Sequence, residues 1–157
     1  QTPCTEFTLS GSRWWATKGP GPLLEGLAIA SACLRLVVAY RNGLRWWVLE
    51  NPVGRLMHYI GPPKVKQFHP WEYAGYRNNG DPEGDQIPRT DRYTKRTALW
   101  GEFKIPEKRP LKPILGSTEQ PTAGSSWLHR LPPSEDRANL RSMTPAGFAR
   151  AFFEANP

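Results

Sequence analysis

Two residues with complementary chemistry, a cysteine and a glutamate, each stand where a strand is predicted to end. Cys4 follows Pro3, and Glu50 follows the short apolar run Trp46–Leu49. A cysteine thiolate is a strong nucleophile, and a carboxyl group beside a cytosine ring can hydrogen-bond or protonate N3. Addition of the thiolate to C6 makes C5 nucleophilic, and the base must first be flipped out of its stack. Cys4 and Glu50 are therefore a candidate catalytic pair.

The elements between these two residues predict how they come together. Apolar residues recur at helical spacing through residues 21–41, with a proline in the first turn and Asn-Gly after the end. A strand end, a loop, a helix and a strand in this order suit a βαβ unit with parallel strands. We expect Cys4 and Glu50 at the carboxyl edge of one parallel sheet, where open α/β sheets bind ligands. The simpler interpretation is that Glu50 is a solvated strand end before a turn.

The rest of the chain predicts short elements in an α/β fold. Strands are expected at Lys64–Phe68 and Thr97–Phe103, short helices within Val53–Ile60 and from Ser134 to Leu140, a last helix from Thr144-Pro145, and loops over 5–19 and 76–92. We divide the chain into a catalytic part at 1–103, an irregular proline-rich segment at 104–143 and a C-terminal helix at 144–157, which packs back on the domain.

Composition favours an anionic partner. The 157 residues carry a net charge of +7, which favours nucleic acid, and Arg13, Trp14 and Trp15 fall in a loop that could close on it or pack on the core. The two cysteines form no disulfide framework, which indicates a reducing, cytoplasmic setting. No apolar run approaches the roughly 20 residues of a membrane span, and the histidines lack zinc-ligand spacing. A cysteine-dependent hydrolase is disfavoured because no histidine is placed beside Cys4.

Three motifs together resemble the DNA cytosine-5 methyltransferase family. They are Pro3-Cys4 followed by Ser10-Gly11 and Arg13, Leu49-Glu50-Asn51 followed by Pro52 in place of valine, and Tyr93–Thr97 before the apolar Ala98-Leu99-Trp100. The closest pattern is that of phage-borne methylase-like proteins, and it covers nearly the whole chain. The resemblance implies a Rossmann-like methyltransferase sheet that is truncated at its N-terminus, with an irregular proline-rich C-terminal part.

The resemblance also implies roles for individual residues. Cys4 would be the nucleophile, Glu50 would contact the N3 edge of cytosine, and Arg96 matches the first arginine of the later motif, whose second arginine falls on Ala98. The residues implied to contact double-stranded DNA are Arg13, Trp14, Trp15, Lys18, Asn51, Thr94 and Lys95. Asn51 would in addition hold the catalytic loop.

The implied cofactor is S-adenosylmethionine, but the glycine-rich loop that binds it in the family is not found in this chain. Pro3 and Asn156 are the positions left to border the cofactor. We expect an N-terminal segment that is missing, processed away or supplied by a second chain. Without it we expect an inactive protein that binds the cofactor weakly. The implied setting is the cytoplasm of a phage-infected or lysogenic bacterium, with no metal and no membrane. The alternative is a DNA-binding module that keeps the scaffold without catalysis.

Overall fold

The computed structural model describes residues 4, 6–78, 91–113, 134–135 and 141–157. The chain forms two compact units, one from residues 1–67 and 96–103 and the other from residues 68–95 and 104–157. This division differs from the predicted segments, because residues 68–95 group with the C-terminal part. Most of the expected helix from Ser134 to Leu140 and most of the loop at 76–92 lie outside the described residues.

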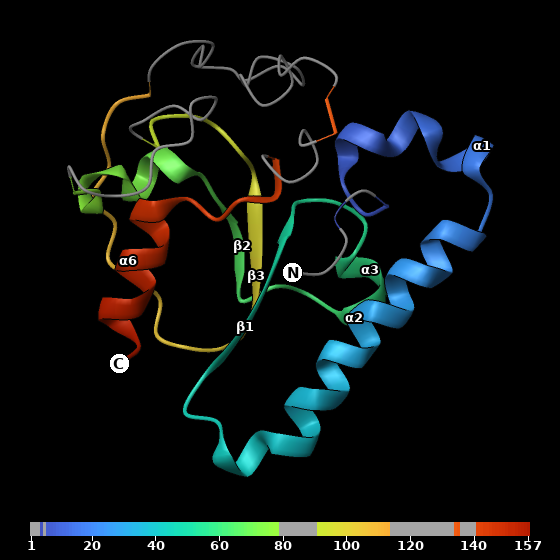
Figure 1. The fold of residues 1–157 in the computed structure, drawn as a ribbon, viewed down its shortest axis with the longest axis horizontal. Helices are drawn as coiled ribbons and strands as arrows, with labels where there is room; N and C mark the ends of the chain where they lie inside the picture. The colour runs from blue at the N-terminus through green and yellow to red at the C-terminus, as the bar shows by residue number, and fades with distance from the viewer. Residues whose placement is uncertain (1–3, 5, 79–90, 114–133, 136–140) are drawn as a thin grey trace. The chain divides into compact units, whose positions relative to one another are not determined.

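The first unit contains most of the regular structure (Figure 1). Its elements are η1 Leu9–Trp14, α1 Trp15–Lys18, α2 Gly21–Tyr40, η2 Arg41–Gly43, β1 Trp47–Pro52, α3 Met57–Ile60, β2 Val65–Phe68, whose last residue belongs to the second unit, and β3 Thr97–Glu102. The long helix and the strands after residue 46 are confirmed within a few residues. Helices and a small sheet together make the fold mixed α/β.

Part of the apolar face predicted for the long helix is the face that α2 buries. Leu23, Leu27 and Cys33 pack against a core that includes Ala30 of α2 itself and Leu49 of β1. Phe7, Leu56, Ala98 and Trp100 complete this core. Trp100 satisfies its indole N–H within the same unit, by donating to Gly61 O at 2.8 Å. Burial of this apolar stripe, rather than helix propensity, is what stabilises a surface helix in water.

Much of the α2 surface outside this core contact is also apolar. Leu24, Leu36 and Val38 are exposed, and an 18-residue window within Gly21–Gly43 has a mean hydropathy of 1.7. By length and composition alone, this segment could cross a membrane. The sequence shows no uninterrupted apolar run of that length, because Glu25 and Arg35 fall within the segment. Core helices of soluble proteins and signal sequences share these properties.

The sheet differs from the predicted parallel pair. Its order is β1-β3-β2, and β1 pairs with β3 in antiparallel register, with Leu49 opposite Trp100 and Pro52 opposite Thr97. Val53 N donates to Arg96 O at 2.9 Å, which makes Val53 and Arg96 a hydrogen-bonded pair and Pro52 and Thr97 a non-hydrogen-bonded one. The proline therefore removes no bond to β3, and β1 continues through it. Glu50 and Asn51 thus lie inside the strand rather than beyond its end.

The segment before α2 is helical rather than a loop. Residues 9–18 form η1 and α1, and Gly19, with φ of 68°, ends α1 in a conformation that favours glycine. Cys4 does not end a strand in the described residues, because its carbonyl accepts hydrogen bonds from Phe7 N at 3.1 Å and Thr8 N at 3.0 Å. This turn replaces the predicted first strand at the position of Cys4.

The second unit is built around aromatic side chains. Phe68 stacks on Phe148 at 4.4 Å, and Tyr73 meets Phe148 edge-on at 5.3 Å between ring centroids. Phe148 belongs to α6, Ala146–Ala155, and Tyr73 to η3, Pro70–Tyr76. The predicted last helix is confirmed, and within this unit it packs on η3.

Candidate functional site

The carboxyl end of β1 brings together two of the predicted motifs. Glu50 and Asn51 lie in the last half of the strand, and the hydrogen bond from Val53 to Arg96 O places Arg96 just beyond the register of β1 and β3. Arg96 is exposed, whereas Asn51 is completely buried. The antiparallel pairing therefore connects the Glu-Asn motif to the arginine motif directly through backbone contacts.

Glu50 and Asn51 project to opposite faces of the sheet, because side chains alternate along a strand. Asn51 shares its face with Leu49, which packs in the core beneath α2. Glu50 projects from the other face and is half-buried, with Oε1 inaccessible to solvent. A carboxyl group can hydrogen-bond a polar ring edge only through an oxygen that the ring can reach, which here would be the other oxygen of Glu50.

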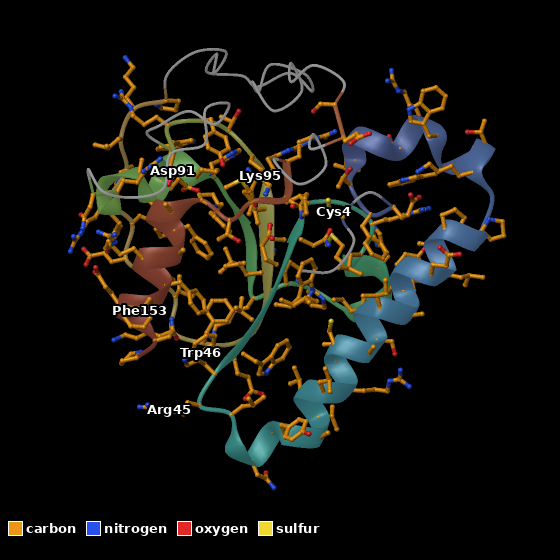
Figure 2. All side chains as sticks on the ribbon, viewed as in Figure 1. Cys4, Arg45, Trp46, Asp91, Lys95 and Phe153 are labelled. Carbon is orange, nitrogen blue, oxygen red and sulfur yellow. The ribbon has the colours of Figure 1, made fainter. Side chains whose placement is uncertain are left out.

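The turn that carries Cys4 lies against the residues that follow β1. Thr8 forms an antiparallel bridge with Gly54, and Arg55 N donates to Phe7 O at 2.8 Å. A Cβ at Gly54 would lie 1.8 Å from Phe7 O, so only glycine permits this approach. In the view of Figure 2, the labelled Cys4 is drawn at the carboxyl end of β1. The structure thus brings the Cys4 turn against the residues that follow the Glu-Asn motif, on the face of β1 that carries Leu49.

Arg55 is a residue of this site that the motifs did not indicate. Its Nε donates to Glu6 O at 2.7 Å, and its guanidinium lies 4.0 Å from the centroid of the Trp15 ring. The signal in the sequence was Gly54-Arg55, a glycine and a basic residue one position after the end of the strand. Arg55 therefore joins the Cys4 turn to α1.

The predicted DNA-contacting loop divides into an exposed part and a packed part. Trp14 is 53% exposed, with the Arg13 guanidinium 5.1 Å from its ring centroid. Trp15 is half-buried beneath Arg55. Lys18 Nζ pairs with Glu6 Oε1 at 2.6 Å, which offsets part of its positive charge. Arg13 and Trp14 are thus the members of this group best exposed to a nucleic acid.

The remaining predicted residues fall elsewhere. Thr94, Lys95 and Asn156 belong to the second unit, and Pro3 lies outside the described residues. Asn156 Oδ1 accepts from Lys104 N at 2.7 Å, and its Nδ2 donates to Lys104 O at 3.0 Å. These bonds give Asn156 a structural role at the end of α6. Its role beside a cofactor stays a prediction.

The described residues do not fit S-adenosylmethionine as a Rossmann-like site would. Such a site needs a glycine turn between a strand and a helix, open so that the backbone can approach the ligand. Gly54 is the glycine between β1 and α3, and its open side is filled by Phe7 O. Across the described ranges, no cluster of three or more histidine, cysteine or acidic side chains could hold a metal ion.

Comparisons of the chain with protein-family models, with curated proteins and with solved structures find no match.

Proposed function

We propose that this chain is the catalytic part of a DNA cytosine-5 methyltransferase, which acts on a cytosine flipped out of double-stranded DNA. The observation that carries the proposal is that two of the predicted motifs meet the chain just after β1, the strand that carries Glu50. In the Cys4 turn, Phe7 O accepts from Arg55 N and Thr8 bridges to Gly54, while Arg96 O accepts from Val53 N. These are the residues to which the family resemblance assigns the nucleophile, the N3 contact and an arginine near the base.

In the proposed reaction, the thiolate of Cys4 adds to C6 of the flipped cytosine. A new Sγ–C6 bond forms, the electrons of the C5–C6 double bond shift into the ring, and N3 receives a proton that Glu50 donates or stabilises. C5 then carries the nucleophilic electrons, so its hydrogen can exchange with solvent. The exposed guanidinium of Arg96 offers donors for acceptor atoms of the flipped nucleotide.

DNA would be held first by charge and by exposed aromatic surface. The net charge of +7 favours association with phosphates, and such binding weakens steeply as salt rises. The Arg13–Trp14 pair provides a cation and an exposed ring on which an unstacked base can lie. We propose Thr94 and Lys95 as additional contacts to the DNA. The proposed setting is the cytoplasm of a phage-infected or lysogenic bacterial cell.

S-adenosylmethionine remains the proposed methyl donor, although the residues described here do not form its glycine turn. We propose that a further segment or a second chain completes the cofactor site. In this proposal, the residues of this chain activate the cytosine ring.

A second candidate is a DNA-binding module without catalysis. The observation that favours it is Gly54, whose space is taken by Phe7 O rather than left for a ligand. The exposed Arg13–Trp14 pair would serve such a module equally well.

The proposal is tested with duplex DNA that carries 5-fluorocytosine, in the presence of S-adenosylmethionine and a cell extract from the natural host to supply any completing chain. Fluorine cannot leave C5 as a proton does, so the covalent adduct is trapped and migrates with the DNA on a denaturing gel. We expect an adduct that mass spectrometry maps to Cys4, none with Cys4→Ser, and an unchanged yield with Cys33→Ser. Salt-sensitive DNA binding without any adduct would favour the second candidate.

A further inference from the structure

Arg55 bonds to the Cys4 turn through both its main chain and its side chain. The main-chain N–H donates to Phe7 O at 2.8 Å, and Nε donates to Glu6 O at 2.7 Å. Both acceptors are backbone carbonyls inside the turn that Cys4 O closes through its bonds with Phe7 N and Thr8 N. The two bonds from Arg55 to this turn therefore do not depend on the identity of the side chains at 6 and 7.

The same side chain also contacts α1. The guanidinium lies 4.0 Å from the ring centroid of Trp15, as in a cation–π stack. A planar guanidinium can stack with its face while Nε donates in its plane, which a lysine ammonium cannot do. Glu6 adds a second link between the turn and α1, through its 2.6 Å ion pair with Lys18.

Gly54 fixes where these contacts can form. A Cβ at this position would lie 1.8 Å from Phe7 O and 3.0 Å from the Thr8 Cα, so the two backbones meet at one register. Because Gly54 and Arg55 directly follow β1 and Val53, the turn is tied to the strand that carries Glu50.

We infer that Arg55 is a positioning residue, which holds the turn carrying Cys4 at the carboxyl end of β1 and links that turn to α1. It does not act on the base itself. The inference rests on the proposed function in that it takes Cys4 to be the nucleophile, but the placement of the turn is measurable without any reaction on DNA.

The first measurement is the rate at which iodoacetamide alkylates Cys4, followed over pH in a Cys33→Ser background so that a single thiol reacts. In the folded parent we expect a rate that differs about fivefold or more from that of the same protein unfolded in urea. Arg55→Met removes the side-chain bond and the stack while keeping the length of the side chain. Its rate should approach the unfolded value, and Arg55→Lys should fall between.

Arg13→Met is the matched control, because it removes an arginine from the neighbouring Trp14 ring without a contact to the turn. Its alkylation rate should equal that of the parent. Circular dichroism checks that each variant is folded. If Arg55→Met does not fold, Arg55→Lys decides the question.

The second measurement is exchange of the C5 hydrogen of cytosine in duplex DNA. We expect Arg55→Met to lower the rate at saturating DNA about tenfold or more while the KM for DNA changes little, because orientation rather than binding is lost. If the parent shows no exchange, the proposed function fails, and the alkylation rates still decide the role of Arg55. Parental alkylation rates in both Arg55 variants, or a parent that reacts like the unfolded chain, would overturn the inference.

Discussion

The main-chain N–H of Gly147 donates a hydrogen bond of 2.7 Å to Oδ2 of Asp91, far away in the sequence. Gly147 is in the first turn of α6, where main-chain N–H groups lack partners within the helix, so Asp91 caps this helix from a distant segment. Asp91 is buried and adopts a φ of 53°. Its other oxygen lies 3.7 Å from Arg77 Nη1. Figure 2 labels Asp91 in the second unit.

We predict that Asp91→Ala lowers the free energy of unfolding by about 3 kcal/mol, because it removes the buried carboxylate that pairs with Arg77 and accepts from Gly147 N. Urea unfolding followed by circular dichroism measures the change. Glu102→Ala is the control: it breaks a solvent-exposed ion pair with Arg41 and should have no measurable effect. Equal stabilities of the two variants would contradict the capping role.

Gly147→Ala should also destabilise the protein. The added Cβ would lie 2.4 Å from Tyr73 O, and a backbone carbonyl cannot move aside cheaply. We expect a loss of about 2 kcal/mol or more, measured as a lower thermal midpoint. Gly21→Ala in the first turn of α2 meets nothing within 4 Å and should leave the midpoint unchanged or slightly higher. A Gly147→Ala protein as stable as Gly21→Ala would refute the close packing of α6 on η3.

Burial predicts an alkaline limit to stability. Desolvation, assisted by the nearby Glu72 and Tyr76, raises the pKa of Tyr73 from 10.0 to about 12. Between these two values the folded state binds the proton that the unfolded state has lost, so stability is complete below pH 10 and falls as pH rises towards 12. Tyr73→Phe should flatten this part of the curve of unfolding free energy against pH. An unchanged slope would show that Tyr73 ionises normally.

Trp14 and Trp15 should separate DNA binding from stability. Trp14→Ala removes an exposed ring and should weaken binding to DNA about tenfold, with little change in unfolding free energy. Trp15→Ala removes the surface on which Arg55 stacks and should lower stability instead. Fluorescence anisotropy with labelled duplex and single-stranded DNA, repeated over salt concentration, gives the affinities. Loss of binding only with Trp15→Ala would reverse these assignments.

Local patterns in the sequence predicted the elements better than their pairing. The period of apolar residues gave α2, and alternating or apolar runs gave β1, β2 and β3, because these features depend on neighbouring residues. The antiparallel pairing of Leu49 with Trp100 depends on contacts between distant residues, which no local pattern encodes. For the same reason, the predicted parallel sheet was wrong.

In the candidate site, too, some residues were predicted from local motifs and others depend on contacts with distant residues. Cys4, Glu50 and Arg96 were identified by motif, whereas Gly54 and Arg55 act through backbone contacts with residues about fifty positions away. Asp91 likewise stood in a polar loop without a helix signal beside it. Such residues become visible only once the chain is folded.

The most direct test of the central claim is the exchange of the C5 hydrogen of cytosine with water, because it needs the nucleophile and the acid but no methyl donor. Duplex DNA labelled with tritium at C5 is incubated with the wild-type protein, and tritium release is counted. We predict release by wild type and by Cys33→Ser, and release reduced to background by Cys4→Ser and by Glu50→Gln. No release by a folded wild-type protein that binds the DNA, or undiminished release by Cys4→Ser, would contradict the assignment of Cys4 and Glu50 as the pair that activates cytosine.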